Sequence, residues 1–340
     1  MNSLTDQSDD NNSEDCGCAG CQSSSDLVPP ALDCWYLSGP TAAGKTRVGI
    51  EMARLLNAEI VSLDSMAIYR GMDIGTATPT PEQLRAVPHH LLNILDPVEE
   101  FSVSSYVKRA HHLIERIRAA GRDVLFVGGT PMYLKAMLRG LYTGPPADWA
   151  FRKEVEEEVR RVGVEPLYKR LVQVDPLSAD KLHKNDVRRI IRALEVYKIT
   201  GEPISHRQLQ FEEGARAEDC RVFVLGWPRA TLHERIDARV ERMFHHGLIG
   251  EVQGLLNCFG RLGRTASQAV GYREAIEYCR GEMSLSEAKS RVQVRTHQFA
   301  RRQETWFRSL SECQRIERDQ RMEAAEIARR LVELGRKVKQ

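Results

Sequence analysis

A glycine-rich octapeptide near the start of the chain constrains its fold more than any other feature. The segment GPTAAGKT, Gly39 to Thr46, follows the apolar run Cys34 to Leu37 and precedes the amphipathic stretch Arg47 to Leu56. It satisfies the pattern G-x-x-x-x-G-K-[ST], in which backbone amides and a helix N-terminus surround phosphate groups. A strand, such a loop and a helix in this order predict an α/β fold with a parallel sheet. An ordinary glycine turn is the alternative, and the flanking patterns disfavour it.

The octapeptide also predicts a binding site for a diphosphate and a magnesium ion. Lys45 is expected to contact phosphate oxygens, and the hydroxyl of Thr46 is expected to help hold Mg²⁺. The predicted diphosphate-binding residues are Gly39, Pro40, Thr41, Ala42, Ala43, Gly44, Lys45 and Thr46. The pattern alone leaves open which diphosphate is bound and which reaction follows.

Short apolar runs alternate with amphipathic stretches along most of the chain. Strands are predicted at Cys34 to Ser38, Glu59 to Leu63, His90 to Ile94, Val124 to Val127 and Arg221 to Leu225. Residues 143–220 contain only charged helical segments, which predicts an all-helical insertion domain in a P-loop NTPase-like parallel sheet flanked by helices. The predicted division is an acidic disordered tail at 1–30, a P-loop core at 31–142, the insertion at 143–220, a continued core at 221–315 and a C-terminal helix at 316–340.

Composition predicts a disordered tail, the class of partner and the cellular location. The first 30 residues are rich in Ser, Asn and Asp, which is typical of disorder, and their cysteines Cys16, Cys18 and Cys21 lack a nearby fourth metal ligand. The net charge is +2, yet seven acidic and no basic residues precede Lys45, so the rest of the chain is basic and permits a polyanionic partner. No apolar run approaches the roughly 20 residues that span a bilayer. We therefore expect a cytoplasmic protein that does not bind membranes.

The positions of the acidic residues differ from those of common P-loop NTPases, in which a strand ends in an acid that supports the magnesium ion. The run VLFVGGT ends in Gly128-Gly129-Thr130 without an acid, whereas IVSLDS places Asp64 after the second strand. Because parallel strands deliver their carboxyl ends to one edge, Asp64 should lie beside the diphosphate, where it could accept a proton from an amine or hydroxyl. A role in a turn or helix cap is the alternative for Asp64 and for Thr130.

Six ordered motifs extend from about residue 34 to residue 310. They are GPTAAGKT, LDSMAIYRGMDIGTATP, VGGTPMYLKAML, NDVRRIIRALEVY, VGYREAI and ARRQETWFR. Together they resemble the motifs of tRNA dimethylallyltransferases, also called tRNA isopentenyltransferases. The resemblance implies transfer of a dimethylallyl group from dimethylallyl diphosphate to N6 of the adenosine just 3′ of the anticodon, with Mg²⁺ as cofactor and pyrophosphate as leaving group. The implied partner is the tRNA anticodon stem-loop, bound by the insertion domain, and we expect a monomer.

The resemblance also implies roles for individual residues. Asp64 would be the general base, Thr41 would lie near the bridging oxygen, and Arg239 would contact pyrophosphate, a surface ion pair being the alternative for Arg239. The implied tRNA-binding residues are Asp64, Ser65, Met66, Ala67, Thr130, Arg152, Arg188, Arg189, Ile190, Ile191, Arg192, Gln268, Ala269, Val270, Gly271, Tyr272 and Arg273. Departures occur at Ala43, Ala67 and Thr78, where Ser, Gln and Lys are common in the family.

The helix expected at Asp186 to Thr200 carries three of these residues. We predict Asn185 as its N-cap and a buried face that includes Tyr197, with Arg188, Arg189 and Arg192 together on the opposite face. A solvated basic face is the alternative to a tRNA-binding one.

Three other functions are compatible with parts of the sequence. An adenylate dimethylallyltransferase would use the same donor but would not need the insertion or its arginines. A P-loop small-molecule kinase would use ATP, and the absence of an acid at Gly128-Gly129 argues against it. A non-catalytic RNA-binding protein would retain the basic faces without needing Lys45 or Asp64.

Overall fold

The computed structural model describes residues 27–207, 214–319 and 321–338. The predicted tail lies outside these residues up to position 26, and so do Cys16, Cys18 and Cys21. The prediction that the disordered tail extends to residue 30 is wrong, because Leu27–Val28 form strand β1. This strand pairs antiparallel with β6, Leu141–Tyr142.

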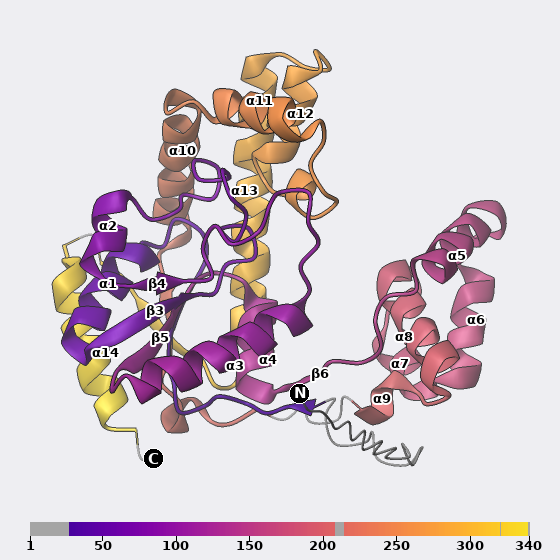
Figure 1. Cartoon of the computed structure of the whole chain (residues 1–340), viewed down its shortest axis with the longest axis horizontal. Helices are drawn as coiled ribbons and strands as arrows, with labels where there is room; N and C mark the ends of the chain where they lie inside the picture. The colour runs from indigo at the N-terminus through magenta and orange to yellow at the C-terminus, as the bar shows by residue number, and fades with distance from the viewer. Residues whose placement is uncertain (1–26, 208–213, 320, 339–340) are drawn as a thin grey trace, which may run out of the picture.

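A six-stranded parallel sheet forms the centre of the fold (Figure 1). Its strands are β2 Trp35–Ser38, β3 Ala58–Ser62, β4 His89–His90, β5 Asp123–Val127, β7 Val222–Gly226 and β8 Gln314–Glu317. They lie side by side in the order β4-β3-β5-β2-β7-β8. The predicted α/β class is therefore confirmed, and β2, which leads into the glycine-rich loop, lies in the interior of the sheet.

Helices cover both faces of the sheet because the central strands are apolar on both sides. Trp35 and Leu37 of β2 belong to a hydrophobic core shared with α1, Lys45–Leu56, and α14, Ala324–Arg336. Tyr36, between them in sequence, points to the opposite core, shared with two further helices. These are α3, Val103–Ala119, and α4, Pro131–Arg139.

A second group of helices extends beyond the carboxyl edge of the sheet (Figure 1). It comprises α10 Arg229–His245, α11 Leu248–Phe259, α12 Tyr272–Cys279 and the long α13 Leu285–Arg308, and the short helix η3 Ala266–Gln268 packs against α12. The short helix α2 Pro81–Ala86 lies between β3 and β4 in the chain. A separate hydrophobic core joins α11 and α12 to the loop that follows β3. The loop after β3 is thus held against the helices that overhang the sheet.

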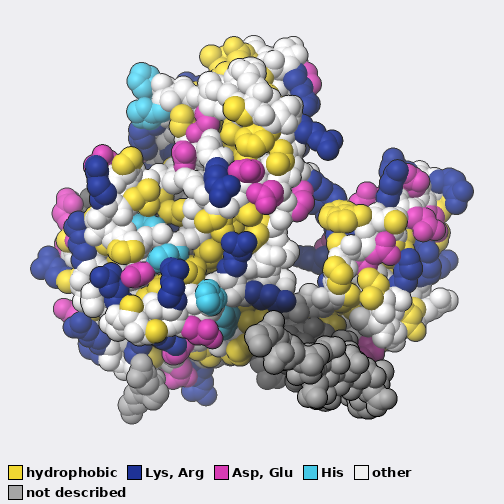
Figure 2. Space-filling model, viewed as in Figure 1, with side chains coloured by type: hydrophobic (Ala, Val, Ile, Leu, Met, Phe, Trp, Pro, Cys, Tyr) yellow, Lys and Arg dark blue, Asp and Glu magenta, His cyan; other side chains and the backbone are white. Residues whose placement is uncertain are grey.

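The insertion forms a separate helical body beside the core (Figures 1 and 2). It contains α5 Trp149–Val162, α6 Glu165–Val174, α7 Pro176–Lys181, α8 Val187–Thr200 and α9 Ile204–Arg207, followed by the turn η2 Ala217–Asp219. Residues such as Val155, Leu171 and Ile190 form its own buried core. Among the described helices, none combines the length and the apolarity required to cross a bilayer.

One strand prediction was wrong, and one strand of the central sheet was not predicted. The run His90 to Ile94 contributes only His90 to β4, because Leu91 and Asn93 have positive φ angles of 59° and 50°, which are incompatible with an extended strand. The edge strand β8 was missed altogether. Its sequence, QRIE, alternates between half-buried and exposed positions and so lacks the apolar run that identified the central strands.

Three smaller predictions also require correction. Asp186, and not Asn185, is the N-cap of α8, since its carboxylate accepts the N–H of Arg189. Tyr197 is 36% exposed and does not belong to the buried face of that helix. The C-terminal helix does not begin at residue 316, because β8 and a connecting segment precede α14.

Candidate functional site

The loop from Gly39 to Thr46 has the conformation required of a phosphate cradle. Gly39 has a φ of 143°, and a Cβ there would come within 2.5 Å of the Leu225 carbonyl oxygen in the neighbouring strand. Gly44, with a φ of 88°, precedes the first residue of α1. The helix N-terminus and the loop amides therefore converge at the carboxyl edge of the sheet, which favours an anion.

Lys45 occupies a position beneath this loop. Its ammonium donates hydrogen bonds to the carbonyl oxygens of Gly39, at 3.0 Å, and Pro40, at 2.8 Å. Burial lowers the pKa of Lys45 to about 8, with Arg239 acting in the same direction and the Asp64 carboxylate opposing it. Burial likewise lowers the pKa of Arg239, which Asp64 again opposes. Two cations and one carboxylate therefore share this part of the site, and the excess positive charge suits a diphosphate.

Arg239 is half-buried on α10, beside the buried Ile236 and Val240. It donates a hydrogen bond to the Thr76 carbonyl oxygen at 3.0 Å and makes no ion pair with any residue in the described ranges. The surface ion pair considered as an alternative is thus not found. Its placement in the cavity wall is compatible with an anion contact.

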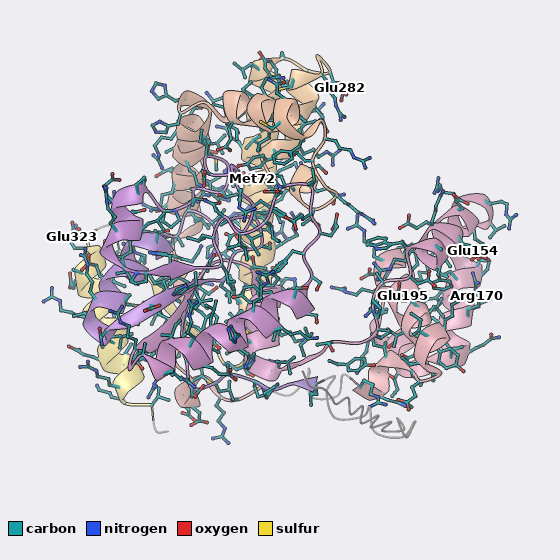
Figure 3. The ribbon with its side chains drawn as sticks, in the orientation of Figure 1. Met72, Glu154, Arg170, Glu195, Glu282 and Glu323 are labelled. Carbon is teal, nitrogen blue, oxygen red and sulfur yellow. The ribbon has the colours of Figure 1, made fainter. Side chains whose placement is uncertain are left out.

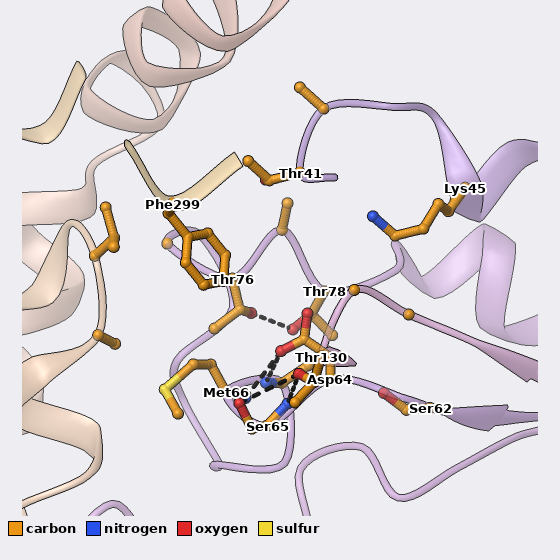
Figure 4. Close-up of a pocket in the computed structure, with 18 of the residues that line it drawn as sticks. Thr41, Lys45, Ser62, Asp64, Ser65, Met66, Thr76, Thr78, Thr130 and Phe299 are labelled. Carbon is orange, nitrogen blue, oxygen red and sulfur yellow. Dashed lines mark hydrogen bonds between the residues drawn. The ribbon is translucent and has the colours of Figure 1, made fainter. Parts of the chain in front are cut away.

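Asp64 and Thr130 are joined through one turn (Figure 4). The Asp64 Oδ1 atom accepts the N–H groups of Met66, at 2.9 Å, and Ala67, at 3.3 Å. Thr130 precedes α4, yet its hydroxyl makes no cap and instead accepts the Ser65 N–H at 3.0 Å. Asp64 therefore does perform the turn role considered as an alternative. That role uses Oδ1, and the carboxylate still faces the cavity that contains Lys45.

Gln303 supports the phosphate loop from the side of α13, and the sequence interpretation missed it. Its side-chain oxygen accepts the Thr41 N–H at 2.9 Å, while its amide donates to the Gly129 carbonyl oxygen at 2.5 Å. The residue is 3% exposed and lies between Ala300 and Phe307 on the buried stripe of α13. A polar residue on an apolar stripe is the signal that could have identified it. It connects the two glycine turns that follow β2 and β5.

Two arginines hold the other side of the loop and were also missed. Arg235 donates to the Ala42 carbonyl oxygen at 2.9 Å, and Arg318 donates to that of Ala43 at 3.0 Å. Both guanidinium groups lie on the ring of Trp227, at 4.6 and 4.9 Å from its centroid. They bind carbonyl groups of the loop and therefore occupy none of its N–H groups.

The loop that carries Thr76 is fixed by a carboxylate from α11. Glu251 accepts the N–H groups of Asp73 and Ile74 at 2.9 and 2.8 Å, and the Tyr272 hydroxyl donates to it at 2.6 Å. Burial and the Glu251 charge raise the pKa of Tyr272, so this hydroxyl remains a donor. The segment containing VGYREAI is thereby attached to the loop that borders the phosphate site.

A cavity of about 2440 Å³ connects these groups with the insertion domain. Small-molecule sites commonly measure about 300–1,000 Å³. The predicted residues that line it are Thr41, Ala42, Gly44, Lys45, Thr46, Asp64, Ser65, Met66, Ala67, Thr130, Arg152, Arg188, Ile191, Arg192, Arg239, Gln268, Ala269, Val270 and Tyr272. The volume exceeds what a prenyl diphosphate needs, and it leaves room for a second, larger substrate.

Other predicted residues lie outside the cavity wall. These are Gly39, Pro40, Ala43, Arg189, Ile190, Gly271 and Arg273. Ile190 is fully buried in the insertion core, and Arg189 forms an exposed ion pair with Asp186. The three arginines of α8 therefore do not form one face toward the cavity, since only Arg188 and Arg192 line it.

A buried carboxylate of the insertion holds two arginines of this wall. Glu195, on the side of the helical body that faces the core (Figure 3), is fully buried and binds Arg152 through two hydrogen bonds of 2.8 and 2.7 Å. It also binds Arg192 at 2.5 Å. Burial by itself would raise the pKa of Glu195, but the two arginines hold it below its usual value. Both arginines are thus kept in fixed positions at the cavity.

Thr46 is the one predicted metal ligand, and it lines the cavity directly after Lys45. No group of three or more His, Cys, Asp or Glu side chains within the described parts of the chain forms a metal cage. A single hydroxyl nevertheless suits Mg²⁺, which retains several waters and binds substrate phosphates beside one or two protein ligands. The residues present therefore fit a magnesium ion that arrives with a diphosphate.

Comparison with known sequences adds independent information. Residues 67–310 match the family model described as IPP transferase. A tRNA dimethylallyltransferase of Rhodopirellula baltica is 51% identical over 294 residues, which cover 84% of this chain and 88% of the relative. A tRNA dimethylallyltransferase of Symbiobacterium thermophilum is 46% identical over 273 residues, covering 80% and 85%.

Solved structures agree with these matches. A tRNA isopentenylpyrophosphate transferase from Bacillus halodurans has 36% identity and a TM-score of 0.65, covering 90% of this chain and 98% of that one. A eukaryotic dimethylallyltransferase described as acting on tRNA has 25% identity and a TM-score of 0.69, covering 84% and 73%. From the family match and these identities, the chain belongs to the IPP transferase family.

Proposed function

We propose that the protein transfers a dimethylallyl group from dimethylallyl diphosphate to N6 of the adenosine just 3′ of the tRNA anticodon. The observation that carries the proposal is the single cavity that joins the phosphate loop and Asp64 to the arginines of the insertion. The wall formed by the phosphate loop and Asp64 suits a diphosphate donor, and the wall formed by the insertion arginines suits a polyanionic acceptor. The names of the family relatives agree with both halves of this assignment.

In the proposed reaction, the bond between the allylic carbon and the bridging oxygen breaks, and pyrophosphate leaves with the electron pair. The loop amides, Lys45 and Arg239 stabilise the charge that develops on this leaving group. Thr46 would hold Mg²⁺, which would supply further positive charge beside the leaving group. Thr41 is the hydroxyl-bearing loop residue proposed to lie near the bridging oxygen.

The adenine N6 lone pair forms the new bond to the allylic carbon, and Asp64 accepts the proton that N6 loses. The Asp64 carboxylate suits this step because the turn amides bind only its Oδ1 atom, which leaves Oδ2 available to accept the proton. Because the turn after β5 carries no acid, this wall lacks the strand-end carboxylate that supports Mg²⁺ in P-loop NTPases. The proposal is that of a monomeric, cytoplasmic enzyme.

A labelling experiment tests the proposal. Purified protein is incubated with radiolabelled dimethylallyl diphosphate, Mg²⁺ and either bulk tRNA or AMP, and label in the nucleotide product is counted. Label in tRNA is expected. Label in AMP alone would identify an adenylate dimethylallyltransferase, and label in neither would remove the prenyltransferase assignment. A parallel reaction with γ-labelled ATP and the same acceptors tests for kinase activity, for which no product is expected.

A further inference from the structure

Trp149 is a large aromatic side chain exposed at the wall of the cavity. It is the first residue of α5 and is 53% exposed, whereas Trp35 and Trp227 are 3% and 4% exposed. Its ring lines the cavity that also contains Asp64. An exposed tryptophan in a shared cavity points to a ligand, because a side chain of this size is ordinarily well buried.

Two guanidinium groups flank the Trp149 ring. The guanidinium carbon of Arg152 lies 5.0 Å from the ring centroid, and that of Arg264 lies 5.9 Å from it. Arg152 belongs to the insertion and is immobilised by the buried carboxylate of Glu195. Arg264 belongs to the core segment before η3; its backbone N–H donates to Glu100 at 3.2 Å, and its guanidinium lies 3.9 Å from the Glu156 carboxylate of the insertion. Trp149 therefore lies where the insertion approaches the core, with a guanidinium group from each beside it.

An exposed aromatic ring beside two guanidinium groups suits an unpaired nucleobase with its flanking phosphates. An aromatic plane attracts any nucleobase by stacking, and adjacent guanidinium groups attract the phosphates that flank an unpaired base. A protein partner would instead be expected to bury a patch of several residues with an apolar centre and a polar rim. Trp149 is a single ring within a basic cavity wall that includes Arg188 and Arg192, so the surroundings favour single-stranded RNA.

We propose that Trp149 stacks on an unpaired base of the tRNA anticodon loop other than the reacting adenosine. The inference rests on the proposed function, since it assumes that tRNA occupies the cavity. The reacting base must approach Asp64 at the sheet edge, whereas Trp149 belongs to the insertion wall. Trp149 thereby helps to select and orient the loop, and it takes no part in bond making.

Kinetics of three variants provide the first test. Trp149→Ala is expected to raise KM for tRNA by about 10-fold, as the loss of one base–aromatic stack would, with kcat and KM for the prenyl donor unchanged. Trp149→Phe is expected to remain within about 3-fold of the wild type, because a ring is retained. Tyr197→Ala is the matched control, since Tyr197 is an exposed aromatic residue of the same domain that does not line the cavity.

Fluorescence provides a second readout that does not depend on catalysis. Binding of an anticodon stem-loop to the wild type is expected to quench tryptophan emission more strongly than binding to Trp149→Phe, because stacking on a base quenches the indole directly. Stem-loops with a single abasic nucleotide then identify the stacked base: at that position alone, Trp149→Ala should cause no additional loss of affinity.

The outcomes separate this inference from the proposed function. If the wild type prenylates tRNA but Trp149→Ala has an unchanged KM for tRNA, the stacking role is refuted and the function stands. If the wild type does not label tRNA, the function itself fails. Should Trp149→Ala fold poorly by thermal melting, the quenching comparison with Trp149→Phe decides, and equal quenching would refute the stack.

Discussion

Replacement of Asp64 by asparagine should separate the two roles of this side chain. Asparagine retains an oxygen that can accept the N–H groups of Met66 and Ala67, which Asp64 holds at 2.9 and 3.3 Å. It removes the charge and the proton acceptor. We therefore expect Asp64→Asn to fold with nearly wild-type stability, and Asp64→Ala to lose about 2 kcal/mol because two hydrogen bonds of about 1 kcal/mol each disappear.

The expected catalytic loss is much larger than the loss of stability. General-base catalysis contributes about 10²–10⁴-fold, so kcat of Asp64→Asn should fall by that factor, equivalent to about 3–5 kcal/mol of barrier. Donor affinity should be retained or increased, because the carboxylate that opposes the positive charge of Lys45 and Arg239 is gone. tRNA should still bind measurably.

Single-turnover assays with labelled donor, combined with tRNA binding and thermal melting, measure these quantities separately. Asp73→Asn is the matched control, since Asp73 is another carboxylate in the cavity wall and its Oδ1 accepts a hydrogen bond from Asn93 that asparagine can also accept. Wild-type turnover by Asp64→Asn would refute the general-base role. An equal loss in both variants would show that the charge of the cavity matters, and not the position of Asp64.

Three further predictions concern other parts of the molecule. Burial lowers the pKa of Lys45 to about 8, so the affinity for the prenyl donor, measured by calorimetry, should fall as pH rises through 8 and the Lys45 charge is lost. Lys45→Met should remove this pH dependence. A wild-type affinity that does not change with pH would contradict the prediction. Glu195→Gln should destabilise the insertion by about 3 kcal/mol, because it leaves Arg152 without its carboxylate. The pKa of Glu195 is depressed in the folded state, so its contribution to stability should be present above the ordinary pKa of 4.5 and lost as pH falls through the depressed value. Melting curves followed by circular dichroism at several pH values measure this contribution, with Asp180→Asn as the control. Gly75→Ala should lower the melting temperature and kcat, because the added Cβ would come within 2.3 Å of the Tyr272 ring; an unchanged melting curve would show that the loop moves at no cost.

Much of the candidate site was predictable because its signals are local. The loop from Gly39 to Thr46 requires glycines within a few residues of one another, and the strand before it requires consecutive apolar side chains. The rule that parallel strands end at one edge placed Asp64 and Thr130 near that loop without any knowledge of distances. The structure brings both to the cavity wall, although their binding roles stay predictions.

Short or polar segments were harder to interpret from the sequence. Strand β8 has four residues with two of them exposed, so its sequence resembles a loop. Helical projection placed Arg188, Arg189 and Arg192 away from the buried residues of α8, and none of the three is buried. Projection cannot show where the cavity lies, and only Arg188 and Arg192 line it.

The sequence by itself determined the phosphate loop, the parallel α/β core, the helical insertion and the family, since each depends on residues close together in the chain or on ordered motifs. Tertiary structure alone decided which distant side chains support that loop: Gln303 from α13 joins it to Gly129, and Arg318 reaches it only because β8 extends the sheet beside β7. It also decided that Trp149 faces the same cavity as Asp64. The physical reason is that hydrogen bonds and stacking depend on the distance between groups in space, and this distance cannot be read from their separation along the chain.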